Sequence, residues 1–272
     1  MNKELRIGVG VKSSCSNGFD LVRDTLVPIA KKTQKIVAFT LAETLIVIGV
    51  IGIVSALTLP NLNNTTGDKE KVAKVKKVYQ NLNDALGRAE AVYGPYSDWF
   101  INDGDNAKAK AKRAGERITE FMKVSKTCGT DKNSGCFNSG DILALKNGNG
   151  ELASPESFDT VYKIITADGT SIAFVSNATV RVDIDGPTKG KNTFGYDFFE
   201  FNYDNERGYI PENFGLTTVE GLYRALISEY GGQVSASWII NYDNADYLEF
   251  AKTSDNKCKN GTTPTEANPR CK

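Results

Sequence analysis

Few residue types in this chain could carry out catalysis. Histidine is absent from all 272 residues, which removes the commonest general base and the commonest transition-metal ligand. The sequence sets no serine or cysteine nucleophile beside a base, and no Gly-rich phosphate loop follows a strand pattern. We therefore expect a protein that is not an enzyme.

A group of aspartates is the remaining candidate for chemistry. Asp183 and Asp185 stand just before Gly186, and Asp197 follows further along the chain. Carboxylate oxygens at a turn suit calcium, so these three residues are candidate calcium ligands, and no other cofactor is indicated. The spacing is not that of an EF-hand, because Phe194 stands where the final glutamate would be. An Asp-Gly turn between two strands explains the same residues without a metal.

One apolar segment, residues 39–59, determines how the rest of the chain is interpreted. It reads FTLAETLIVIGVIGIVSALTL and contains one charged residue, Glu43. As a helix it would span about 31 Å, close to the hydrocarbon thickness of a bilayer, which favours a membrane span over a buried core helix. Lys31, Lys32 and Lys35 precede it. By the positive-inside rule the N-terminus stays in the cytoplasm and the remainder is exported.

The residues around the start of this segment form a recognisable motif. A small residue, Ala38, is followed by Phe39 and Thr-Leu, then by Glu43 as the fifth residue after Ala38, then by an apolar helix pattern and Pro60. This stretch resembles the N-terminal signature of type IV pilins and type II secretion pseudopilins, although Ala38 stands where the family more often has glycine. The resemblance covers about 24 residues, a length close to that of one membrane span.

The resemblance implies processing and assembly. A prepilin peptidase would cut between Ala38 and Phe39, and Phe39 would become the N-methylated first residue. A carboxylate at the centre of a membrane helix costs about 2.5–3.5 kcal/mol, so Glu43 is expected to have a partner. In the family that partner is the N-terminal amine of a neighbouring subunit.

The function expected from the resemblance is structural. The chain would be a major or minor subunit of a type IV pilus-like or type II secretion-like filament, held first in the bacterial inner membrane with its head exported. Its partners would be related pilin subunits, the prepilin peptidase and the inner-membrane assembly platform. The alternative is a membrane-tethered extracytoplasmic binding module that never polymerises. Such a tether needs no carboxylate inside the membrane, so Glu43 discriminates between the two.

Charge argues against a nucleic-acid binder. The chain has 33 basic and 33 acidic residues. Residues 1–38 carry a net charge of +4, which leaves −4 on the part that would be exported. An acidic head does not favour binding to a polyanion, although a local basic patch would escape this count.

The expected export also explains the cysteines. Cys15 lies in the leader, and the other four would enter an oxidising compartment where disulfides persist. Among the three possible connectivities we favour the two pairs that are closest in sequence, Cys128–Cys136 and Cys258–Cys271. A zinc site is the rival interpretation, but neither pair has CxxC spacing and no histidine is present.

The fold expected from these patterns is α+β, with a long N-terminal helix packed on an antiparallel sheet. We expect a leader at residues 1–38, a transmembrane or assembly helix at 39–60 with a kink at Pro60, the second half of the long helix at 61–95, and a head at 96–272. A polar hinge at 61–67 would precede that second half, which has an apolar stripe and a lysine-rich face that we expect to be solvated. The stripe consists of Val72, Val75, Val78, Tyr79, Leu82, Ala85, Leu86, Ala89 and Val92.

Local patterns predict the elements of the head. Residues 106–123 are rich in Ala, Lys and Arg and predict a helix. Apolar or β-branched segments at 161–166, 171–175, 179–183 and 198–203 predict strands. Thr217 and Glu220 have the spacing of a capping box, which predicts a helix that ends near Gly231 and Gly232.

Overall fold

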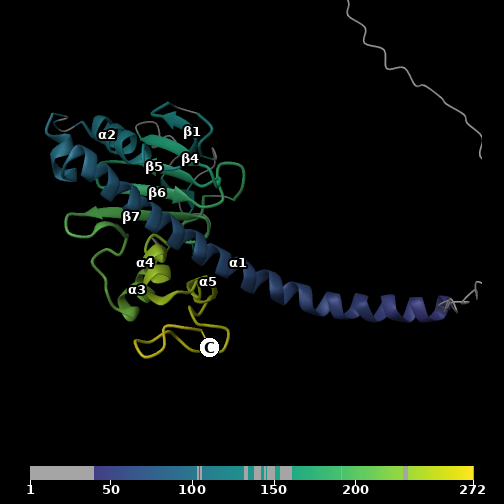
Figure 1. Cartoon of the computed structure of the whole chain (residues 1–272). Coiled ribbons are helices and arrows are strands. Elements are labelled where there is room, and N and C mark those ends of the chain that lie inside the picture. Colours follow the sequence, from purple (N-terminus) through teal and green to yellow (C-terminus); the bar gives the residue numbers. More distant parts are fainter. Residues whose placement is uncertain are drawn as a thin grey trace, which may run out of the picture. The chain divides into compact units, whose positions relative to one another are not determined.

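The computed structural model confirms an α+β chain, with helices and a six-stranded antiparallel sheet (Figure 1). It describes residues 40–102, 104, 106–131, 134–137, 142–143, 145, 151–153, 161–190, 192–228 and 232–271; the side chains of residues 56–66 and 151–153 are not described. The predicted leader and the predicted cleavage site at Ala38 and Phe39 lie outside these residues. The chain divides into two compact units, residues 1–52 and 53–272.

The first element is one long helix, α1 (Leu41–Tyr93). It ends where Gly94 takes a φ of +80° and Pro95 cannot continue the helix. The helix runs through Pro60 and residues 61–67 without interruption, so the predicted polar hinge is wrong. A proline removes one backbone hydrogen bond, but the helical turns on both sides of it keep the backbone helical at this position. No helix in the described part of the chain is both long and apolar enough to cross a membrane.

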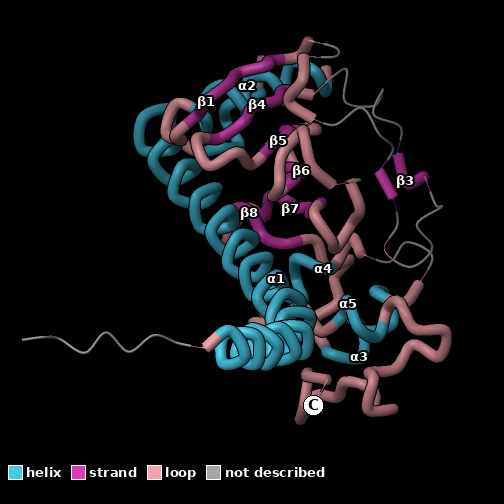
Figure 2. The backbone as a smooth tube through the Cα atoms, turned by 90° about the vertical axis from the view of Figure 1, so that its right-hand side faces the viewer, coloured by secondary structure: helices cyan, strands magenta, loops and turns pink. Residues whose placement is uncertain are grey.

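The second part of α1 packs on the sheet through its apolar stripe. Leu82, Ala89 and Val75 are fully buried there, together with apolar side chains of the central strands. Figure 2 shows this part of the helix running along one side of the sheet. Tyr79 is half-buried against the same core, whereas Val92 is 62% exposed and does not belong to the stripe. The predicted amphipathic stripe is therefore confirmed from Val72 to Ala89.

The main sheet has the strand order β1-β4-β5-β6-β7-β8, and every neighbouring pair is antiparallel. The bounds are β1 Val124–Gly129, β4 Tyr162–Thr166, β5 Ser171–Phe174, β6 Thr179–Asp183, β7 Phe198–Asp204 and β8 Gly208–Pro211. The four predicted strands correspond to β4, β5, β6 and β7 and agree to within one residue at each end. A second sheet pairs β2 (Ile142–Leu143) with β3 (Glu151–Ala153).

Side-chain alternation divides the core between the two faces of the main sheet. Ile172 and Phe174 of β5 join the large cluster that includes α1, whereas Ala173 between them joins a smaller cluster with Phe194 and Phe198. This period of two is what a strand requires, because successive side chains point to opposite faces. Both faces of the central strands are therefore covered.

Short helices complete the head. Their bounds are η1 Tyr96–Phe100, α2 Ala107–Thr119, α3 Val219–Leu226, α4 Ser235–Tyr242 and α5 Tyr247–Phe250. Asn106 caps α2 by accepting the N–H of Ala109 at 3.0 Å, and the helix ends four residues before the predicted bound. Gly115 lets α2 approach β4, because a Cβ there would lie 2.1 Å from the Tyr162 ring.

The predicted cap of α3 is off by one position. Thr218, and not Thr217, accepts the N–H of Gly221 at 3.1 Å, and Glu220 pairs with Arg224 on the helix surface. The helix ends at Leu226, before the predicted glycine stop, and residues 229–231 are not described. Either of two adjacent threonines can serve as an N-cap, and only Thr217 has a glutamate three residues later, so the backbone geometry and not the capping-box spacing identifies the cap.

Candidate functional site

The start of α1 contains a capping box that the predicted processing motif overlaps. The backbone N–H and the hydroxyl of Thr40 both donate to Glu43 Oε2, each at 2.9 Å. In return the N–H of Glu43 donates to Thr40 Oγ1 at 3.3 Å. Reciprocal bonds of this kind satisfy free donors at a helix N-terminus. Both bonds to the carboxylate end on Oε2, so among the described residues Oε1 is left for a further donor.

The helix that follows this capping box is apolar and exposed. From Leu41 to Val54 its large apolar side chains are between 53% and 79% exposed. They are Leu41, Leu45, Ile46, Val47, Ile48, Val50, Ile51, Ile53 and Val54. Exposed apolar surface of this extent marks an interaction site for protein or lipid.

The second part of α1 is joined to the head by polar contacts as well as by the core. Asn83 Oδ1 accepts the N–H of Tyr209, and Asn83 Nδ2 donates to the carbonyl of Tyr209, both at 2.9 Å. These two bonds attach the helix to β8, the edge strand of the sheet. On the same side of the helix, the rings of Tyr79 and Phe201 stack with centroids 6.1 Å apart.

The lysine-rich face of α1 is only partly solvated, which corrects the sequence expectation. Lys77 pairs with Asp168 of the β4–β5 turn at 2.6 Å, and Lys76 pairs with Asp243 at 2.5 Å. Lys71 is half-buried, with its ammonium 3.8 Å from the centre of the Tyr196 ring. Burial lowers the pKa of Lys71 to about 8, although nearby carboxylates oppose the shift.

The three candidate calcium ligands come together at the loop between β6 and β7. Asp183 ends β6 and is fully buried, and Asp197 lies just before β7 and is 3% exposed. A Cβ added to Gly190 would lie 2.0 Å from Asp197 Oδ2 and 3.1 Å from Asp185 Oδ1. Both oxygens therefore face the same backbone position, and Gly190, which has a φ of +69°, leaves room for them.

Hydrogen bonds satisfy part of this cluster. Asp183 Oδ1 accepts the N–H groups of Asp185 at 3.2 Å and Gly186 at 3.0 Å. Asp183 Oδ2 and Asp185 Oδ1 are shielded from water and have no hydrogen-bond partner in the described part of the structure. Burial, together with the neighbouring Asp185, raises the pKa of Asp183 to about 9. As the side chains stand, no three Asp, Glu or Cys groups of the described residues are arranged to hold a metal by themselves.

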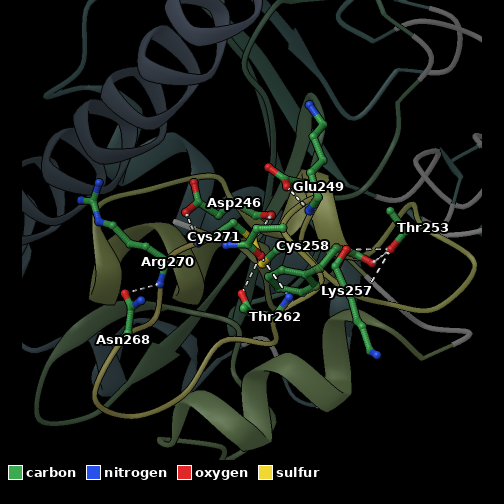
Figure 3. The surroundings of a disulfide bond; sticks show 12 residues. Asp246, Glu249, Thr253, Lys257, Cys258, Thr262, Asn268, Arg270 and Cys271 are labelled. Atoms are coloured by element: carbon green, nitrogen blue, oxygen red, sulfur yellow. Dashed lines mark hydrogen bonds between the residues drawn. A yellow bond between two sulfur atoms is a disulfide. The ribbon is translucent and has the colours of Figure 1, made fainter.

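Both predicted disulfides are present. Cys128 is joined to Cys136 and Cys258 to Cys271, while Cys15 lies outside the described residues. Figure 3 shows the second bond beside α5, where Asp246 accepts the N–H of Cys271 at 2.8 Å. Cys258 donates its own N–H to the carbonyl of Thr262 at 2.9 Å. The disulfide thus closes a C-terminal loop that is also held by backbone hydrogen bonds.

The contacts of four residues at these sites were not predicted from the sequence: Thr40, Lys71, Asn83 and Gly190. Thr40 carried a signal, because Thr40 and Glu43 have the same capping-box spacing that was used to place α3. Lys71 and Asn83 have their roles through contacts with residues far along the chain, and Gly190 has its role through the conformation of its own loop. Comparison with known proteins adds no assignment: no family model, no curated protein and no solved structure matches this chain.

Proposed function

We propose that this protein is a pilin-like filament subunit, cut by a prepilin peptidase between Ala38 and Phe39. It is held in the inner membrane by the first part of α1 and then incorporated by an assembly platform into a type IV pilus-like or type II secretion-like filament. The observation that carries the proposal is the division of α1. Its first part exposes large apolar side chains directly after the processing motif, and its second part is built into the head.

Glu43 has a defined place in this proposal. The capping box fixes the side chain through Oε2 and leaves Oε1 to accept the amine of Phe39 from a neighbouring subunit. Such a pair would set the axial register of the packed helices, because a buried ion fits only where its partner lies. The capping box by itself would explain a glutamate at this position without any partner, so an experiment has to separate the two roles.

The substitution Glu43→Gln makes that separation. Glutamine keeps an acceptor oxygen for the Thr40 N–H, so it preserves the capping box and removes only the charge. Removing one partner of a buried ion pair costs about 3–5 kcal/mol, so we expect fibre incorporation to fall about tenfold or more. Membrane insertion and cleavage are expected to survive. The measurement is the ratio of sheared to cell-bound protein on immunoblots, together with total fibre yield.

The matched control is Thr40→Ala, which weakens the cap by about 0.5–2 kcal/mol and leaves the charge in place. If Glu43 serves assembly, Thr40→Ala retains more incorporation than Glu43→Gln. Equal incorporation by Glu43→Gln and the wild-type chain would reject the assembly role. That result would favour the alternative of a membrane-tethered binding module.

A further inference from the structure

The second part of α1 borders a cavity of about 350 Å³. Its other walls come from residues 121–123, just before β1, and from residues 166–168, at the end of β4. The N–H of Ala167 donates to the carbonyl of Lys123 at 2.8 Å, so these two walls are joined to each other. A cavity of this size is in the range of pockets that hold small ligands, and a hydrogen bond between its walls maintains its shape.

Part of the lining of this cavity is apolar. Phe121 and Met122 line it, and both are half-buried against the main core, which holds them in place. The Arg88 guanidinium lies 5.5 Å from the centre of the Phe121 ring. A ligand bound to the guanidinium would therefore have an aromatic ring beside it.

The lining also carries three cations and two carboxylates, of which one pair is already matched. Lys77 pairs with one oxygen of Asp168 at 2.6 Å. The hydroxyl of Thr166 donates to the other oxygen of Asp168 at 2.5 Å. Both oxygens of this carboxylate are thus engaged, and the pair adds no net charge to the cavity.

The other two cations of the lining, Arg88 and Lys123, are not matched in this way. Arg88 Nη1 lies 3.6 Å from Asp84 Oδ2, which is too far for a hydrogen bond. Within the described residues, the Lys123 ammonium has no ion pair. Two cations therefore stand against one carboxylate. The Arg88 side chain is 58% exposed, so an anion can reach it from solvent.

We propose that this cavity binds a small organic carboxylate, whose charged group pairs with Arg88 and whose apolar body contacts Phe121 and Met122. A guanidinium presents paired N–H donors in the geometry that a carboxylate accepts, and Lys123 adds a second positive charge. Asp84 disfavours ligands with several negative charges, because like charges repel each other. The apolar part of the lining favours an organic acid over an inorganic ion. The inference concerns the head alone and does not depend on filament assembly.

The test uses the full chain, purified in detergent, with sodium benzoate as the probe. A ligand-observed NMR titration, with protein-free micelles as the blank, should show saturable binding with a dissociation constant of about 10⁻³ M, because the cavity is open to water. Benzamide has the same ring without the charge and should bind about tenfold more weakly. Inorganic phosphate has charge without an apolar body and should also bind about tenfold more weakly than benzoate.

Two variants locate the probe. Arg88→Gln removes the guanidinium fork and should weaken benzoate binding about tenfold, because hydrogen bonds between charged groups are lost. Lys123→Gln removes the more distant point charge and should weaken it about threefold. The matched control is Lys69→Gln, which removes an exposed cation from α1 outside the lining and should bind benzoate as the wild-type chain does.

Several outcomes would overturn the inference. Equal binding of benzoate and benzamide would show that the cations play no part, and phosphate binding as tight as that of benzoate would remove the apolar contact. If Arg88→Gln and Lys123→Gln both bind benzoate as tightly as Lys69→Gln, the probe binds elsewhere. The comparison of the three probes uses the wild-type chain, so it decides the question even if a variant fails to fold.

Discussion

The two parts of α1 have the same backbone conformation and opposite surroundings. From Leu41 to Val54 the large apolar side chains are more than half exposed, whereas from Val75 to Ala89 the stripe is almost completely buried. The first part is apolar on all sides, and the second is apolar on one side only. The comparison teaches that the head stabilises one part of the helix through its core. The other part has no equivalent core among the described residues, and under the proposed function its partners would be lipid or other subunits.

The largest effect should come from truncating one leucine in each part. Leu82→Ala removes a fully buried side chain, and we expect it to lower the free energy of unfolding of the head by about 2–5 kcal/mol. Leu45→Ala removes a side chain that is 61% exposed and should change that value by less than about 0.5 kcal/mol. Urea unfolding of the detergent-solubilised chain, followed by tryptophan fluorescence, measures both. Similar losses of unfolding free energy in the two variants would contradict the difference between the two parts of α1.

The next effect concerns the C-terminal part of the head, which meets the second part of α1 through Lys76 and Asp243. Replacing Cys258 and Cys271 together by serine should cost about 2–4 kcal/mol, because the disulfide restricts the unfolded chain. The same urea titration measures the loss.

Peptide mapping without reduction should show this bond and the Cys128–Cys136 bond in protein isolated from cells. Free thiols at all four positions would contradict export to an oxidising compartment.

A smaller effect on the free energy of unfolding should distinguish two asparagines on the second part of α1. Asn83→Ala removes both hydrogen bonds to Tyr209 and leaves its backbone groups unpaired, which should cost about 1–3 kcal/mol. Asn81→Ala, at an exposed position two residues earlier, is the matched control and should be nearly neutral. If both substitutions are neutral, the apolar stripe alone attaches α1 to the sheet.

The smallest effect is the pH dependence of the ion pair between Lys77 and Asp168. Partial burial would raise the pKa of Asp168, but hydrogen bonds from Lys77 and Thr166 outweigh it and lower the pKa to about 2. A carboxyl with a lowered folded pKa stabilises the fold fully above its ordinary value near 3.8, and this contribution is lost as the pH falls toward 2. The pair is solvent-accessible, so the loss should be about 1 kcal/mol or less. Asp168→Asn should make the free energy of unfolding less dependent on pH in this range. If the variant and the wild-type chain have the same pH dependence, the ion pair does not contribute to stability.

The parts of the fold that the sequence predicts are those with a repeated apolar pattern. The stripe from Val72 to Ala89 has helical spacing, and the strands β4 to β7 alternate or are apolar throughout, so each reveals both its type and its buried face. The segment of β1 was missed because VSKTCG has no apolar alternation. It forms an edge strand through backbone bonds to β4, which leave no pattern in the side chains.

The candidate sites could be predicted only in part, because they depend on contacts between residues that are not adjacent in the sequence. The aspartates could be named from the sequence, but their burial and the place of Gly190 depend on how the β6–β7 loop folds back on itself. The hinge at residues 61–67 was predicted from polar composition. A helix with favourable turns on both sides tolerates such a stretch, because propagation adds one hydrogen bond for each residue that it fixes.

The most direct test of the proposed function is the mass of the protein isolated from the cells that make it. A pilin-like subunit should lack residues 1–38 and begin at Phe39, with the mass of one added methyl group on its N-terminal amine. A chain that retains residues 1–38 would contradict the proposal, because an uncleaved leader leaves no free Phe39 amine to pair with Glu43.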